Sequence, residues 1–288
     1  MWEVFEASQH KYFGDDTALV GASKSPLEEE VMARRRAVIQ RFVPDTSRIL
    51  EVGPGAGTFL RWARKQGHLL TAIEESASLA RTLEATIDGK IIVGSFESSG
   101  LPDASQDVLC SFHVIEHVPD PRAHLAEAAR VVRPGGLAIV ATPNANSWQQ
   151  RLFRRLSPNF DSAHLRVFSQ ASLQHLAGET GWSVVRVETP EYTSGWLRVV
   201  SKSIRKLRRE DEEATAGKYV TDISRNGHWV LAAARLLTWP LRAAQSWMKG
   251  GNEILFVLNR NVLTAEPTNN CTITFPVNST IGCQEDQL

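Results

Sequence analysis

Short β-prone runs alternate along the chain with segments in which apolar residues recur at helical spacing. Residues 26–43 show the helical pattern, and Ser25 followed by Pro26 is a favourable way to begin a helix. Residues 48–52 form a β-prone run that stops at three closely spaced glycines, and residues 58–66 return to the helical pattern. The pattern therefore predicts a helix, a strand, a glycine turn and a second helix, in that order.

The alternation continues beyond this unit. Asp120 is suited to cap the helix at 121–132, and the Pro-Gly-Gly sequence at 134–136 is expected to close that helix with a turn. Strands that alternate with helices predict an α/β fold with a mostly parallel sheet wrapped by helices. The further strands are predicted at 69–74, 90–93, 107–112, 137–141, 184–187 and 254–258, and the further helices at 76–86, 121–132 and 169–180.

A long segment, residues 190–251, separates the last two predicted strands, where connections usually have about 2 to 6 residues. Its first half has an amphipathic helical pattern with Lys and Arg largely on one side, and its second half is an apolar, tryptophan-rich run that Pro240 is expected to break. Residues 196–248 therefore suit contact with an anionic membrane surface, a cap over an acceptor pocket, or a homodimer contact. The acidic run at 210–213 weakens the membrane interpretation.

These patterns predict how the chain is divided. The long insert follows a core and precedes its last strand, and both ends of the chain lack a regular pattern of useful length. The tail is rich in Asn, Thr, Pro and Gln and is expected to be poorly ordered. The predicted parts are an N-terminal extension at 1–24, a core at 25–189, a helical insert at 190–251, a final core strand at 252–263 and the tail at 264–288.

The overall charge is balanced, with 32 Lys plus Arg and 32 Asp plus Glu, so no nucleic-acid partner is expected. The three cysteines are too few and too scattered for a disulfide framework or a zinc site. The N-terminus has acids where a secretion signal needs cations, and no run is apolar enough to cross a bilayer. We expect a cytoplasmic protein, peripheral at the membrane if the insert binds lipid.

The glycines after the first strand are the first candidate binding site. A glycine loop between a strand and a helix places backbone N–H groups beside a ligand at the carboxyl edge of the sheet. With glycines at 53, 55 and 57, the third falls one residue too early for a dinucleotide fingerprint. The carboxylate of Glu51 would repel a pyrophosphate but attract a ligand that carries an ammonium and a sulfonium.

Further motifs follow this loop in order: Glu74 ends the second strand, Ser95-Phe96-Glu97 follows the third, and residues 112–121 follow the fourth. With the loop and the turn at 133–136, they resemble class I S-adenosylmethionine-dependent methyltransferases such as the ubiquinone-pathway O-methyltransferases. The resemblance implies a Rossmann-like seven-stranded sheet with helices on both faces, and S-adenosyl-L-methionine as cofactor. The family usually has an aspartate where Ser95 stands. The cofactor-binding residues that it implies are Glu51, Gly53, Gly55, Gly57, Glu74, Ser95, Phe96 and Phe112.

The end of the fourth strand carries the candidate catalytic residues. Methyl transfer from a sulfonium requires an aligned acceptor and, for a hydroxyl, removal of its proton. Candidate bases are His113, His117 and His164, and the last begins an H-x-x-x-F-S stretch found in similar bacterial methyltransferases. With Glu116 they are also suited to hold a divalent cation. The arrangement is similar to the E-x-x-E-H metal site of related O-methyltransferases, but His113 replaces the first acid, so we expect no metal.

The sequence thus predicts an enzyme that methylates an oxygen atom of a small-molecule, glycan or lipid-linked acceptor. Two alternatives stay open. In the first alternative, the chain is a cofactor-binding or scaffolding protein that kept the fold but lost turnover. This alternative stays open because a fold alone does not establish activity. The second alternative, an RNA 2′-hydroxyl methyltransferase, is disfavoured by the balanced charge.

Overall fold

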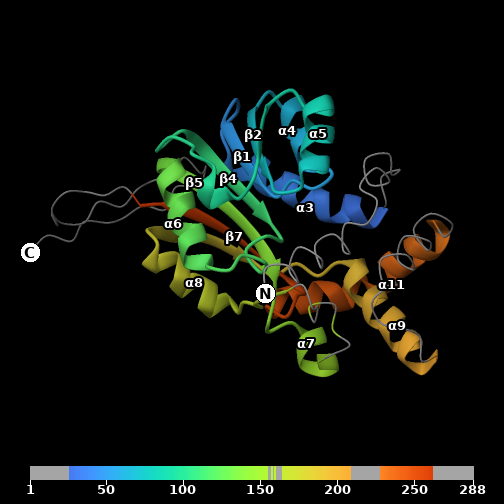
Figure 1. Ribbon diagram of the computed structural model, residues 1–288. Helices are drawn as coiled ribbons and strands as arrows, with labels where there is room; N and C mark the ends of the chain where they lie inside the picture. The colour runs from blue at the N-terminus through green and yellow to red at the C-terminus, as the bar shows by residue number, and fades with distance from the viewer. Residues whose placement is uncertain (1–25, 155–156, 158, 160–163, 209–227, 262–288) are drawn as a thin grey trace, which may run out of the picture.

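The computed structural model describes residues 26–154, 157, 159, 164–208 and 228–261, and the predicted extension, tail and acidic run lie outside them. Its centre is a seven-stranded sheet (Figure 1) made of β1 (Arg48–Val52), β2 (Leu69–Glu74), β3 (Lys90–Val93), β4 (Gln106–Phe112), β5 (Val132–Pro143), β6 (Trp182–Glu188) and β7 (Glu253–Arg260). The strand order is β3-β2-β1-β4-β5-β7-β6. Strand β7 runs antiparallel to β5 and β6, and the other pairs are parallel. The expected Rossmann-like, seven-stranded fold is confirmed.

Alternate residues of the central strands supply two hydrophobic cores, one on each face of the sheet. In β1, Ile49 belongs to one core and the adjacent Leu50 to the other, because successive side chains of a strand point to opposite faces. The Ile49 face is covered by α3 (Pro26–Phe42), α4 (Thr58–Lys65) and α5 (Ala77–Thr86), and the Leu50 face by α6 (Pro121–Val131) and α8 (Gln170–Glu179). Burial on both faces explains why these strands are continuously apolar.

Capping residues determine where several helices begin. The Ser76 side chain accepts a hydrogen bond from a backbone N–H at the start of α5, and Ser169 does the same at α8. The carboxylate of Asp120 accepts from two backbone N–H groups of α6, as its place before Pro121 predicted. Local sequence is therefore sufficient to locate these helix starts.

The turn predicted at 134–136 is wrong. Strand β5 begins at Val132 and includes these residues, with an irregular register against β4 between Gln106 and Val108. A Cβ atom on Gly136 would lie 2.7 Å from the carbonyl oxygen of Asp107, so this approach of the two strands requires glycine. The Pro-Gly-Gly sequence therefore bends a strand instead of separating it from a helix.

The break predicted at Pro240 is also wrong, because α11 (His228–Trp247) continues through it. Proline removes one backbone hydrogen bond of the helix. Because Pro240 is exposed, this hydrogen bond is lost on the side of the helix that faces away from the protein. With α9 (Thr193–Arg208), α11 forms the insert, which projects away from the sheet beside α7 (Trp148–Phe153), a helix that the pattern did not predict (Figure 1). Trp196 of α9 donates a hydrogen bond to Gln245 of α11. Among the described helices, none has the length and apolar character to cross a membrane.

Candidate active site

The glycine loop follows β1 and leads into α4. Gly53, Gly55 and Gly57 all have positive φ angles, of 63°, 53° and 70°. A Cβ on Gly53 would lie 2.7 Å from the Val114 side chain, and one on Gly57 would lie 2.5 Å from Leu83. A Cβ on Gly55 would have no heavy atom within 4 Å. The outer two glycines are therefore required by packing, whereas Gly55 faces open space and leaves its backbone accessible to a ligand.

Glu74 supports this loop from the end of β2. One carboxylate oxygen accepts a hydrogen bond from the Gly55 backbone N–H at 3.3 Å, and the other accepts from the Ser76 N–H at 3.0 Å. The side chain is buried. Glu74 therefore lies against the middle of the loop, and its expected bond to ribose hydroxyls stays a prediction.

Glu51 is the most unusual charge of the site. It is only 3% exposed, and its Oε2 atom has no hydrogen-bond partner. It lines a cavity of about 140 Å³ between the glycine loop and α3, together with Arg35 of α3. Burial raises the pKa of the Glu51 carboxyl to about 8, although the charge of Arg35 acts in the opposite direction. A buried carboxyl with an unpartnered oxygen and a raised pKa is suited to a ligand whose positive charge favours its ionised form.

The aromatic residues expected to bind cofactor pack into the two cores. Phe96 is 2% exposed, and its ring lies 5.1 Å from that of His124. Phe112 is also buried, with the Arg35 guanidinium 4.2 Å above its ring. The Ser95 hydroxyl forms a hydrogen bond with that of Ser98, at 2.8 Å. Both phenylalanines therefore pack in the cores, and their expected contact with the cofactor stays a prediction.

His113 lies just past β4 with a positive φ of 59°, and both of its ring nitrogens are engaged. Its Nδ1 lies 3.1 Å from Glu116 Oε1 and its Nε2 lies 2.6 Å from Glu253 Oε2. Although desolvation opposes the charged form, the hydrogen bonds to these two carboxylates raise the pKa of His113 to about 9. A charged imidazole with both nitrogens occupied cannot accept a proton, so the structure does not support His113 as the general base.

Three residues of this cluster were missed from the sequence. Glu253 begins β7, Tyr192 donates its hydroxyl to Glu253 at 2.9 Å, and Thr142 of β5 donates to Glu116 at 3.0 Å. Glu253 and Glu116 are both buried. A signal for Glu253 was available, since an acid directly before an apolar strand is unusual. Because β7 is antiparallel to β5, its first residue lies beside the end of β5 at the carboxyl edge.

His117 and His164 come together beside this cluster. Their ring centroids are 5.0 Å apart, and His164 Nδ1 lies 3.1 Å from the carbonyl oxygen of Asn159. Backbone N–H groups of Leu165 and Arg166 donate to the carbonyl oxygen of Glu116, which fixes the segment that carries His164 against the end of β4. Ligand atoms of Glu116, His117 and His164 lie within 4.8 Å of one another. Glu116, His117 and His164 thus lie together, and His113 joins this group through Glu116 while its other ring nitrogen is paired with Glu253.

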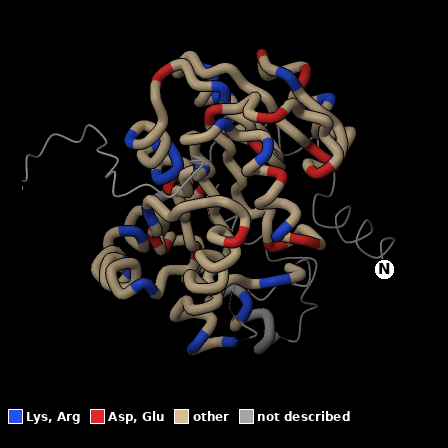
Figure 2. The backbone as a smooth tube through the Cα atoms, turned by 90° about the vertical axis from the view of Figure 1, so that its left-hand side faces the viewer, with Lys and Arg blue, Asp and Glu red and all other residues tan. Residues whose placement is uncertain are grey.

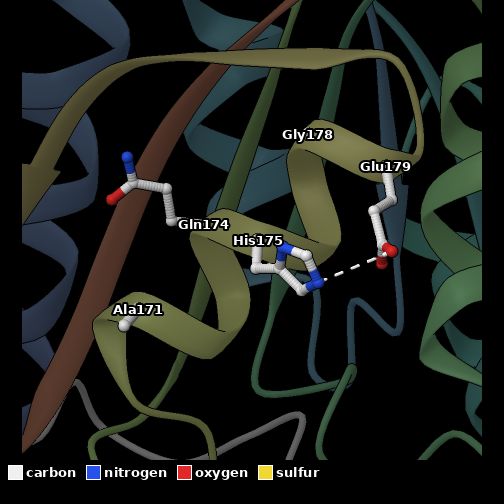
Figure 3. A pocket seen from close by; sticks show the side chains of 5 residues that line it. All are labelled: Ala171, Gln174, His175, Gly178 and Glu179. Carbon is white, nitrogen blue, oxygen red and sulfur yellow. Dashed lines mark ion pairs between the residues drawn. The ribbon is translucent and has the colours of Figure 1, made fainter.

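A larger hollow, of about 540 Å³, lies elsewhere (Figure 3). All of its lining residues belong to α8, and within it His175 pairs with Glu179 at 3.5 Å. A hollow formed by one face of one helix does not enclose a ligand, and it contains none of the predicted site residues. The smaller cavity beside Glu51 is therefore the better candidate.

The sheet is Rossmann-like, and its first strand leads into a glycine loop beside the buried carboxyl of Glu51, which faces a cavity. This is the fold and site of a cofactor-dependent methyltransferase. Residues 27–187 match the family model for a methyltransferase domain. The match covers more than half of the chain, which belongs to this methyltransferase family. S-adenosyl-L-methionine is the cofactor named for its relatives, and the site described above fits a cationic ligand of that kind.

Three relatives differ in how much they share with this chain. A probable S-adenosylmethionine-dependent methyltransferase of Mycolicibacterium smegmatis is 37% identical over 32% of this chain and 34% of its own length. The chain thus matches about a third of that relative. The dimethylglycine N-methyltransferase of Parasynechococcus marenigrum is 26% identical over 76% of this chain and 83% of its own. The ubiquinone biosynthesis O-methyltransferase of Thiobacillus denitrificans is 27% identical over 62% of this chain and 81% of its own length.

Solved structures share the fold at low identity. A SAM-dependent methyltransferase from Archaeoglobus fulgidus aligns with a TM-score of 0.52 and 16% identity over 89% of this chain and 99% of that one. The cyclase SpnF aligns with a TM-score of 0.57 and 15% identity over 88% of this chain and 94% of the SpnF chain. The same fold therefore occurs in proteins named for different reactions, so the reaction must be argued from the site.

Proposed function

We propose that the protein transfers a methyl group from S-adenosyl-L-methionine to a hydroxyl oxygen of a small-molecule, glycan or lipid-linked acceptor, in the cytoplasm. The observation that carries this proposal is the His117–His164 pair, with ring centroids 5.0 Å apart beside the carboxyl end of β4. Parallel strands present their carboxyl ends to the ligand crevice of such a sheet. An imidazole placed there is suited to take the proton of an acceptor hydroxyl near neutral pH.

The chain offers a distinct place for each part of the cofactor. When bound, S-adenosyl-L-methionine supplies an electrophilic methyl group on a sulfonium. The Glu51 carboxyl, whose Oε2 atom has no partner, becomes the counter-charge of the cation once it ionises beside it, and the open space around Gly55 lets a ligand approach the loop closely. Glu74 holds the loop in position through Gly55, and we propose that its carboxylate also binds the ribose hydroxyls. Excluding water from the cavity beside Glu51 strengthens its attraction for a cation.

His113 has a positioning role in this proposal. Its ion pairs with Glu116 and Glu253 link the end of β4 to the start of β7, so they fix the segment that leads to His117. The two carboxylates are buried and need this partner, because an unpaired buried charge is strongly destabilising. His113 thus remains charged while His117 and His164 are left to handle the acceptor proton.

We propose that this proton removal requires no metal ion. Glu116, His117 and His164 are close enough to hold a divalent cation. However, each carboxylate oxygen of Glu116 already interacts with a neighbour, His113 at one oxygen and Thr142 at the other. A hard cation would have to compete with both interactions, which makes the base mechanism the simpler account of this cluster.

The names of the relatives support a small acceptor without identifying it. One is named for O-methylation in ubiquinone biosynthesis and another for N-methylation of dimethylglycine. Their names differ in the methylated atom, so the choice of oxygen here rests on the histidine pair. The cyclase among the solved structures keeps open the alternative of a cofactor-binding protein without methyl transfer.

Two measurements test the proposal. Calorimetry of the full chain with S-adenosyl-L-methionine measures binding, and labelled-methyl transfer to fractionated cell extract measures turnover. Replacing His117 or His164 by Asn should lower kcat by about 10²- to 10⁴-fold and leave cofactor affinity unchanged. His175→Asn, on the exposed face of α8, is the matched control. Unchanged turnover in both site variants would exclude the base mechanism, and binding without transfer to any fraction would favour the non-catalytic alternative.

A further inference from the structure

Helix α11 has an inverted distribution of polar and apolar side chains. Its buried side includes Arg242, which is 7% exposed, and Gln245, which is fully buried. Its outward side is apolar: the exposed residues between 232 and 248 are all apolar except Arg235. The largest of them are Leu236, Leu237, Trp239, Leu241, Trp247 and Met248, between 44% and 85% exposed. A surface helix in water normally has the opposite arrangement.

The polar side of α11 is fixed to the core, so the helix cannot rotate its apolar side inward. Gln245 donates to Gln149 at 2.7 Å and to the buried carboxylate of Glu191 at 3.0 Å. Arg242 pairs with Glu30 of α3 at 2.5 Å. Turning the helix would leave these buried polar groups without partners, which is costly. The apolar side is therefore a stable surface feature, and a patch of this size indicates a binding partner.

The described side chains of the helices that form this region carry one sign of charge. In the described residues of α7, α9, α11 and the turns that follow α7 and α11, there are Lys and Arg residues but no Asp or Glu. Figure 2 shows blue but no red segments in the lowest part of the molecule, where these helices lie. Apart from Arg242, which is buried and paired with Glu30, the cations whose side chains are described there are Arg151, Arg154, Arg198, Lys202, Arg235 and Lys249.

We propose that the outward side of α11, with the cations around it, binds an anionic lipid surface. Exposed leucines and tryptophans beside Lys and Arg are the composition of helices that lie in the membrane interface, and cytoplasmic leaflets are negatively charged. A second copy of the chain would bring two cationic surfaces together, which makes lipid the better electrostatic match. The protein binds along the membrane plane through α11, and this binding does not depend on the identity of the acceptor.

Co-flotation of the full chain with vesicles tests the proposal. The unmodified chain should float with vesicles of phosphatidylcholine plus phosphatidylserine and stay behind with phosphatidylcholine alone. The double variant Trp239→Ser, Trp247→Ser should lower the partition coefficient at least about tenfold, because it removes much of the apolar contact area. Leu69→Ser is the matched control, since Leu69 is an exposed apolar residue of β2, and it should float normally.

A second measurement does not require a variant. Tryptophan fluorescence of the unmodified chain should be quenched by brominated lipid in anionic vesicles and not in neutral ones. Three results would overturn the proposal: absence of flotation of the unmodified chain with anionic vesicles, equal flotation of the double variant, or a dimer in sedimentation experiments that the double variant abolishes. The last result would assign the surface to a second copy of this chain.

Discussion

Substituting Gly55 by alanine separates cofactor contact from backbone strain. Gly55 has a φ of 53°, and a Cβ atom added to it would have no heavy atom within 4 Å, so the new methyl group displaces nothing in the protein. The left-handed backbone alone should cost the folded state about 1 to 2 kcal/mol. For a chain of this size that corresponds to a fall in Tm of about 2 °C per kcal/mol.

Gly67 provides the matched control. Its φ is 88°, it also has open space around it, and it follows α4 at the opposite edge of the sheet, before β2. Gly67→Ala should therefore cause a similar fall in Tm through the same strain. Only Gly55→Ala places a methyl group where the cofactor must approach the loop.

The assay is calorimetry with S-adenosyl-L-methionine, alongside thermal melting of each variant. Gly55→Ala should raise the Kd at least tenfold, equivalent to about 1.4 kcal/mol, while Gly67→Ala leaves it unchanged. If both variants bind the cofactor as tightly as the unmodified chain, close approach to the Gly55 backbone is refuted. If both lose affinity equally, the effect comes from general destabilisation.

Three further predictions concern charged groups. Burial raises the pKa of Glu51 from 4.5 to about 8, so between these pH values the unfolded chain loses this proton before the folded one, and the stability of the apo protein should fall as pH rises. Cofactor affinity should rise over the upper part of that range, where the folded carboxyl ionises. Glu51→Gln should flatten both profiles in melting and calorimetry, and an affinity profile that Glu51→Gln leaves unchanged would contradict this role. Arg242→Met removes the cation that pairs with Glu30 of α3, so urea unfolding should show a loss of about 3 kcal/mol in the free energy of unfolding. A loss below about 1 kcal/mol would mean that the pair is effectively solvated. Dialysis against a chelator should leave turnover unchanged, and restoration of lost turnover by magnesium or zinc would instead assign Glu116, His117 and His164 to a metal site.

Periodicity and capping residues were sufficient for the order of strands and helices, because each element carries its own local signal. Asp120 was predicted as a helix cap and the structure confirms it, and the helices predicted from residues 76 and 169 begin there with Ser76 and Ser169 as their caps. The two wrong breaks share a cause: proline and glycine were interpreted without their tertiary surroundings. At Gly136 the deciding factor is the neighbouring backbone of Asp107, and at Pro240 it is exposure of the helix.

The site was predictable only where its residues lie within one motif. The loop at 51–57 and the His117 region could be located because strand ends of a parallel sheet meet at one edge. The partners of His113 could not, since Glu253 is far away in sequence and the pairing depends on the direction of β7. The exposure of a phenylalanine such as Phe96 is likewise set by packing that no local pattern reveals.

The two ends of the insert meet. Glu191, before α9, accepts a hydrogen bond from the Asn252 backbone at 2.8 Å, and the Tyr192 hydroxyl donates to Glu253, the first residue of β7. Because the two ends of the insert are joined in this way, doubling the number of residues between them would cost only about 0.6 kcal/mol in chain entropy. The insert is therefore tolerant of changes in length between its closed ends, whereas a helix that replaced α11 would have to supply new partners for the side chains of Gln149 and Glu30.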